Sequence, residues 1–130
     1  MSEENVEIVR RFYEAFNRGD RDGWMRLMSS DVELLAHEIG GGHTVGAEGV
    51  VRGMDEFTSV FASYEVSPDD FYDAGDQVVV RLRRSATSAR SPTSIEDQFG
   101  QVISIRSRRI VRFQSFKRVS EALEAAGLSE

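Results

Sequence analysis

The chain has 130 residues, 40% of them hydrophobic, which suits one domain over residues 1–130 with a hydrophobic core of its own. It contains no cysteine, so disulfide bonds and thiolate metal sites are excluded. The acidic start of the chain lacks the pattern of a secretory signal, and no apolar stretch is long enough to span a membrane. We therefore expect a cytoplasmic protein without membrane contact.

The net charge of −6 is unevenly distributed along the chain. Residues 1–80 hold six basic and seventeen acidic side chains, whereas residues 81–118 hold ten basic and two acidic ones. Clustered arginines can bind phosphates, but base stacking also needs exposed aromatic residues interleaved with them, and the basic stretch lacks that pattern. We expect these arginines on the outside of strands, paired with acidic side chains, and no nucleic-acid partner.

Two helices are predicted in the first thirty residues. Over residues 3–18, apolar side chains recur at helical spacing and form one stripe. The stripe contains Val9, Phe12, Tyr13 and Phe16. Gly19 ends this helix and Asp20 caps the next, which is predicted over residues 21–29 with Trp24 facing inward.

A short strand and a glycine-rich segment follow. Residues 31–38 alternate as a strand, with Leu34 on its inner face and Glu38 at its inner end. Residues 39–49 are predicted to form a mobile loop at the mouth of a pocket. The segment lacks the Gly-Lys-Ser/Thr ending of a phosphate-binding loop, so its glycines indicate no nucleotide cofactor.

His37, Glu38 and His43 superficially suggest a metal site. A zinc protease helix, however, carries its histidines four residues apart, and these are six apart across three glycines. We predict no metal and no cofactor.

A third helix is predicted over residues 54–63, with Phe57 and Phe61 on its inner face. Strands are predicted over residues 69–74 and 77–88. In the second of these, alternation places Val78, Val80 and Leu82 inward and Arg81 and Arg83 outward.

Residues 93–117 predict two long neighbouring strands joined by a polar turn, on which the rest of the chain should pack. One face of the first strand carries Ile95, Asp97, Phe99, Gln101, Ile103 and Ile105. An apolar face with one carboxylate and one amide is either the wall of a pocket or a core with an ion pair, for instance between Asp97 and Arg84. A short helix is predicted over residues 120–126.

This order of elements predicts an α+β fold, in which a strongly curved antiparallel sheet forms a cone around three helices from the N-terminal half. The order and the letters resemble the SnoaL-like branch of the nuclear transport factor 2-like superfamily, which includes ketosteroid isomerases and polyketide cyclases. The resemblance is specific for the fold and weak for function, because the superfamily also holds dehydratases, epoxide hydrolases and binding domains. It is carried by residues 9–28, 50–57, 70–80 and 101–128.

The resemblance also assigns positions to the isomerase machinery. It places Ala36 at the position of the catalytic base, Phe12 at the position of a helix tyrosine, and Asp97 at the position of a sheet acid. Isomerisation then requires Glu38 or Tyr13 to replace a missing group. The acidic positions of the cyclases on the last strand correspond to Arg112, Gln114 and Phe116, none of which is acidic.

Two hypotheses for function follow. The first is an isomerase, cyclase or hydrolase that uses Asp97 as acid or base, with Gln101 and Glu38 orienting substrate or water. The second is a non-catalytic module that binds a ligand in the cone or docks a partner. The aromatic lining expected for the cone suits a small apolar or polycyclic molecule. The expected lining is Tyr13, Phe16, Trp24, Leu34, Phe57, Phe61, Phe99, Ile103 and Phe113.

A homodimer is predicted through the outer face of the sheet. Val79 and Val102 lie on that parity together with rows of arginines, and members of the resembling superfamily commonly pair.

Overall fold

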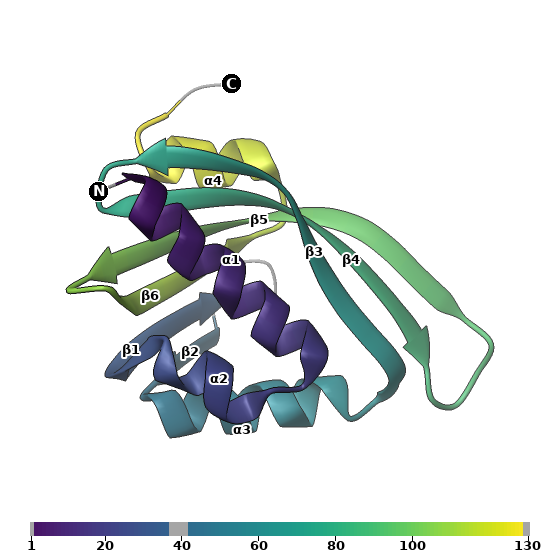
Figure 1. Ribbon diagram of the computed structural model, residues 1–130. Helices are drawn as coiled ribbons and strands as arrows, with labels where there is room; N and C mark the ends of the chain where they lie inside the picture. The colour runs from purple at the N-terminus through teal and green to yellow at the C-terminus, as the bar shows by residue number, and fades with distance from the viewer. Residues whose placement is uncertain (1, 37–41, 129–130) are drawn as a thin grey trace.

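The computed structural model describes residues 2–36 and 42–128 as an α+β fold (Figure 1). The helices are α1 (Ser2–Arg18), α2 (Arg21–Arg26), α3 (Ala47–Thr58) and α4 (Val119–Ala125). The strands are β1 (Met28–Ala36), β2 (Gly42–Val45), β3 (Phe61–Ala74), β4 (Gln77–Ser88), β5 (Ser94–Arg106) and β6 (Arg109–Phe116). Within these ranges no helix is long and apolar enough to cross a membrane.

The strands of the described residues form one curved, unclosed sheet in the order β2-β1-β6-β5-β4-β3. The prediction of an antiparallel sheet is wrong for one pair, because β1 and β6 run parallel, with Leu34 beside Phe113. Parallel neighbours need a long crossover connection. Here the crossover consists of β2, α3, β3, β4 and β5, which lie between β1 and β6 in the chain. It brings β6 beside β1 with both strands running in the same direction.

The concave face of the sheet is covered by α1, and α2 and α3 lie at its β1 end (Figure 1). The predicted apolar stripe of α1 is buried there, with Phe12 and Tyr13 in one core with Leu82, Phe99 and Ile103. The strand parity predicted from the sequence is thus confirmed for Phe99 and Ile103. Burial of these large side chains is the main stabilising term of the fold.

The opposite face of the sheet is covered in part by α4. Val79 and Val102 are fully buried beneath Val119 and Leu123 of this helix. The two valines on which the predicted dimer surface depended are therefore internal. Gly100 allows this packing, because a β-carbon there would lie 2.9 Å from the β-carbon of Ala122.

The helix predicted over residues 54–63 is displaced in the structure. It is α3, which begins at Ala47 after Gly46, a glycine in the left-handed region with φ 95°. Gly53, which directly precedes the predicted helix, lies inside α3. The helix ends at Thr58, and Phe61 instead begins the edge strand β3. The glycine-rich segment is shorter than predicted, because part of it forms β2.

Two further boundaries differ from the prediction. The helix expected to reach residue 29 ends at Arg26, and Met28 already belongs to β1. β3 begins eight residues before the predicted residue 69 and passes through Pro68. Proline is tolerated there because β3 is an edge strand, and its register with β4 shifts between Pro68 and Asp70.

The turn between β5 and β6 has two residues with positive φ, neither of which is glycine. Ser107 and Arg108 have φ values of 53° and 66°. Positive φ at both central positions is typical of a two-residue hairpin turn, in which glycine or asparagine is usual. Arg108 also pairs with Glu4 of α1, at 2.8 Å between Nε and Oε1.

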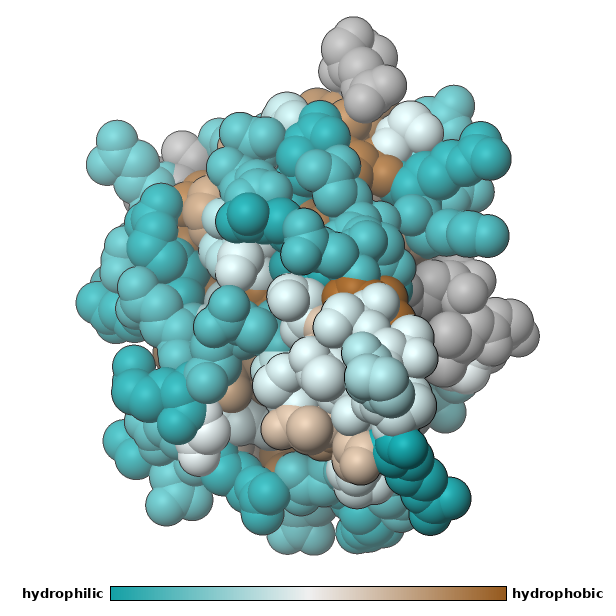
Figure 2. Space-filling view, turned by 90° about the vertical axis from the view of Figure 1, so that its right-hand side faces the viewer, coloured by the Kyte–Doolittle hydropathy of each residue, from teal (hydrophilic) through white to brown (hydrophobic). Residues whose placement is uncertain are grey.

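The end of β4 and the starts of β3 and β5 extend beyond the helices as an arm of the sheet (Figure 1). Figure 2 faces this side of the molecule and shows a mainly hydrophilic surface with a pale area of nearly neutral residues. The arm sequence over residues 85–94 consists of serine, threonine and alanine with one arginine and one proline.

Candidate functional site

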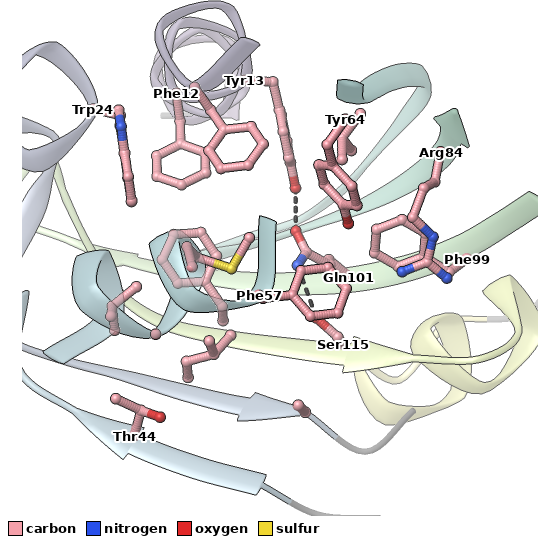
Figure 3. A pocket seen from close by; sticks show the side chains of 18 of the residues that line it. Phe12, Tyr13, Trp24, Thr44, Phe57, Tyr64, Arg84, Phe99, Gln101 and Ser115 are labelled. Carbon is pink, nitrogen blue, oxygen red and sulfur yellow. Dashed lines mark hydrogen bonds between the residues drawn. The ribbon is translucent and has the colours of Figure 1, made fainter. Parts of the chain in front are cut away.

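A cavity of about 230 Å³ lies between α1, α3 and the concave face of the sheet (Figure 3). Its wall is mainly aromatic and aliphatic, with a small set of polar side chains at one end. It is lined by Phe12, Tyr13, Phe16, Trp24, Leu34, Ala36, Gly42, Thr44, Val50, Gly53, Met54, Phe57, Tyr64, Val66, Arg84, Phe99, Gln101, Phe113 and Ser115. A largely apolar cavity with few polar groups is typical of a small-molecule site.

The aromatic part of the wall is a set of mutually packed rings. Phe12 of α1 meets Trp24 edge to face at 5.6 Å between ring centres and lies 4.9 Å from Phe113 of β6. Phe57 of α3 meets Tyr64 of β3 edge to face at 5.4 Å. These rings are held by three helices and the sheet, so the apolar surface of the cavity is formed before any ligand enters.

The polar end begins with a hydrogen-bonded chain that crosses the floor of the cavity (Figure 3). The Tyr13 hydroxyl donates to Oε1 of Gln101, and Nε2 of Gln101 donates to Oγ of Ser115 at 2.8 Å. The three residues come from α1, β5 and β6, and Ser115 is buried. Burial raises the pKa of Tyr13 well above its ordinary value of 10.0, so this hydroxyl stays protonated near neutral pH.

Arg84 of β4 brings a positive charge to the same wall. Its Nε and Nη2 each donate to a carboxylate oxygen of Asp97 at 2.9 Å. Its guanidinium lies over the ring of Phe99 at 4.7 Å. Hydrogen bonding to Asp97 is the largest influence and, with a smaller one to Tyr64, raises the pKa of Arg84 against the opposing effect of burial.

Most of the predicted lining meets at this cavity. Tyr13, Phe16, Trp24, Leu34, Phe57, Phe99, Gln101 and Phe113 are among the lining residues. Phe61 and Ile103 are not. Phe61 belongs to β3, not to the predicted helix, and contacts the rings of Phe57 and Tyr64. Ile103 is fully buried in the core.

The expected position of Asp97 inside the cavity is wrong. Asp97 lies on the concave side of β5, but beyond the reach of the helices, with 45% of its side chain exposed. It does not line the cavity, and its partner is Arg84, as the ion-pair alternative foresaw. Glu38 and His37 fall outside the described residues.

Ser115, Tyr64 and Arg84 line the cavity although they were not predicted to do so. The resemblance pointed to the other parity of the last strand, with Arg112 and its neighbours. Arg112 pairs with Ser104 and Ile110 with Ile105, so one extra residue, Val111, forms a bulge in β6. The bulge shifts the alternation relative to the start of β6, and Ser115 lies on the same inner face as Phe113, which was predicted to line the cavity.

His43, whose spacing superficially suggested a metal site, contacts a carboxylate. Its Nε2 lies 3.1 Å from Oε2 of Glu33, and Nη2 of Arg112 donates to Oε1 of the same carboxylate at 3.1 Å. Hydrogen bonding to Arg112 and then to His43 lowers the pKa of Glu33. Across the described part of the chain, no three histidine or acidic side chains group together as metal ligands.

Comparison with solved structures finds close matches in fold. A nuclear transport factor 2-like protein of unknown function from Burkholderia pseudomallei is 26% identical, with 93% of this chain and 95% of that chain covered and a TM-score of 0.78. The protein TerC, co-crystallised with polyporic acid, is 25% identical over 95% and 98% of the two chains, with a TM-score of 0.78.

A third structure shows the fold alone, at 19% identity, with coverage of 88% and 85% and a TM-score of 0.80. It is a protein from Jannaschia sp. proposed to be a SnoaL-like polyketide cyclase. A comparison with curated proteins found no match. The model of the SnoaL-like domain matches residues 9–113, and this chain therefore belongs to the SnoaL-like family.

Proposed function

We propose that this protein binds a small, flat, largely apolar molecule in the cavity between α1, α3 and the sheet. The observation that carries the proposal is the preformed aromatic wall, which lines a cavity of about 230 Å³. Such a lining suits a small apolar or polycyclic ligand. The co-crystal of TerC with polyporic acid supports it, because that protein shares the fold at 25% identity.

Binding without acid–base catalysis agrees best with the groups on the wall. Among the described lining residues, the titratable side chains are Tyr13, Tyr64 and Arg84, and none is a carboxylate or an imidazole. Ala36 and Phe12, at the positions that the isomerases use for base and tyrosine, both line the cavity and offer no proton-transfer group. An enzymatic role for Gln101 would be to orient a substrate oxygen.

The isomerase, cyclase or hydrolase alternative depends on Glu38, since Asp97 lies outside the cavity. This alternative predicts that the protein turns over a substrate and that Glu38→Gln abolishes the turnover. A cytoplasmic location and a homodimer through the outer face of the sheet stay predictions.

The test of binding uses a neutral probe, 4-acetylbiphenyl, and calorimetric titration. Trp24 is the single tryptophan of the chain and lines the cavity, so its fluorescence reports occupancy independently. Ala36→Phe places a ring in the cavity and should abolish binding. Ala89→Phe places the same ring on the exposed arm and should leave binding unchanged.

The two variants separate the cavity from the surface. Binding to wild type that disappears only in Ala36→Phe supports the proposal. Wild-type protein that binds neither 4-acetylbiphenyl nor polyporic acid, or binding that persists in Ala36→Phe, contradicts it. Thermal unfolding of each variant establishes that the chain is folded.

A further inference from the structure

Ser115 is the last member of the hydrogen-bonded chain on the cavity floor. Its Oγ accepts from Nε2 of Gln101 at 2.8 Å. Within the described part of the chain, no acceptor receives the hydroxyl hydrogen of Ser115 in turn. Ser115 is only 3% exposed, yet it lines the cavity (Figure 3). The floor therefore presents a buried donor to whatever occupies the cavity.

Tyr13 sets the direction of this chain. Burial raises the pKa of Tyr13, so its hydroxyl keeps its proton and donates it to Oε1 of Gln101. Because the amide oxygen is thus occupied by a donor, the amide nitrogen faces Ser115, and Oγ of Ser115 must accept. A serine hydroxyl that accepts from an amide keeps its own hydrogen for another acceptor. Tyr13 is in this arrangement a positioning residue for Ser115.

The three side chains together carry more donor hydrogens than their own bonds use. One hydrogen on each hydroxyl and two on the amide make four, and the two bonds of the chain use two of them. A ligand that displaces water from the floor without offering an acceptor leaves such hydrogens unsatisfied, which weakens its binding. An oxygen without a hydrogen of its own supplies the acceptor, whereas a hydroxyl would add a further hydrogen.

Resting on the proposed function, we propose that the ligand is an aromatic compound with a carbonyl oxygen, and that this oxygen accepts from the hydroxyl of Ser115 while the rings lie against the aromatic wall. Ser115 is then the residue that separates a ketone from a hydrocarbon of the same shape. The aromatic side chains of the wall do not make this distinction, because their contacts depend on shape and apolar area, which the two ligands share.

The experiment compares 4-acetylbiphenyl with 4-isopropenylbiphenyl, in which a CH2 group replaces the carbonyl oxygen and the shape is nearly the same. Calorimetric titration, with the fluorescence of Trp24 as a second readout, gives the ratio of the two affinities. Ser115→Ala should lower this ratio about three- to tenfold against the ketone, the range of one hydrogen bond between neutral groups. The affinity for the hydrocarbon should not fall, because the hydrocarbon makes no hydrogen bond to lose.

Ser104→Ala is the matched control. Oγ of Ser104 also accepts from a glutamine amide, Nε2 of Gln77, at 3.1 Å, but Ser104 does not line the cavity. This variant should keep the wild-type ratio of affinities.

Tyr13→Phe tests the positioning role. Without the tyrosine hydroxyl, Oε1 of Gln101 becomes available to the hydrogen of Ser115, so the preference for the ketone should fall. In a protein that already carries Ser115→Ala, the same change should have no further effect on the ratio. An additional fall in the double variant contradicts a role of Tyr13 that acts through Ser115.

The outcomes distinguish this inference from the proposed function. If both probes bind and Ser115→Ala leaves their ratio unchanged, or Ser104→Ala lowers it equally, the carbonyl contact is overturned while the cavity remains a binding site. If neither probe nor polyporic acid binds wild type, the proposed function fails and this inference fails with it. Should Ser115→Ala not fold, Ser115→Cys keeps the shape with a weaker donor, and a smaller fall of the ratio is expected.

Discussion

The two halves of β5 lie on one strand and share one alternation, yet they have different surroundings. Residues 99–105 are flanked by β4 and β6 and covered by α1 on one face and α4 on the other. Residues 94–98 pair with β4, but β6 ends before reaching them, and they are exposed. Alternation thus fixes the face on which a side chain lies, while the length of the neighbouring elements decides whether it is buried.

The largest expected effect compares an isoleucine in each half. Ile103 is fully buried, whereas Ile95 is 43% exposed. Ile103→Ala should lower the free energy of unfolding by about 2–5 kcal/mol, because it leaves a cavity in the core. Ile95→Ala should cost under about 1 kcal/mol, since the side chain is already partly hydrated. Urea unfolding measures both, and equal losses would show that the arm is covered in solution.

A middle-sized effect concerns the hydrogen-bonded chain that passes through Gln101 in the covered half of β5. The pKa of Tyr13 is raised by burial from 10.0, so above pH 10 the unfolded chain loses this proton before the folded one does. The unfolded state then binds fewer protons, and stability falls as pH rises, by up to about 1.4 kcal/mol per pH unit.

Tyr13→Phe removes this contribution. It should cost about 1 kcal/mol at pH 8, because Oε1 of Gln101 loses its donor. Between pH 10 and 11 it should lose stability less steeply than wild type. Urea unfolding at both pH values gives the two slopes, and parallel slopes would mean that the hydroxyl is hydrated in the native state.

The smallest effect concerns the exposed half. Asp97→Asn removes a charge that is paired with Arg84 but is 45% exposed. Such a pair contributes about 1 kcal/mol or less, well below the loss expected for an ion pair buried in a core. A loss of about 3 kcal/mol or more on thermal unfolding would show that Asp97 is enclosed in solution.

The sequence was sufficient for the fold because the strongest patterns are local. The stripe of α1 and the alternation of β4 both predict the observed core, and the resemblance supplied the order of layers. The position of α3 could not be read from the sequence, because Gly46 and Gly53 could each mark the start of a helix. In the structure Gly46 precedes the helix, whereas Gly53 lies inside it.

The candidate site was predicted in its aromatic part and missed in its polar part. Large rings at helical or strand spacing identify the cavity wall without knowledge of exact register. Ser115 and Arg84 lie on the inner faces of their strands, at the parity of Phe113 in β6 and of Leu82 in β4, so alternation alone could have found both. The reach of the helices does need the three-dimensional structure: β5 outruns them at Asp97, which leaves Asp97 outside the cavity.

The close contact at Gly100 links the two faces of the sheet. α4 approaches the strand there, and the next residue, Gln101, carries the hydrogen bonds that order the cavity floor. On the outer face of the sheet, α4 thus fixes β5 at Gly100 without lining the cavity. The next residue, Gln101, lines the cavity. The C-terminal helix α4 therefore supports, from the outer face of the sheet, the strand segment that forms the cavity floor.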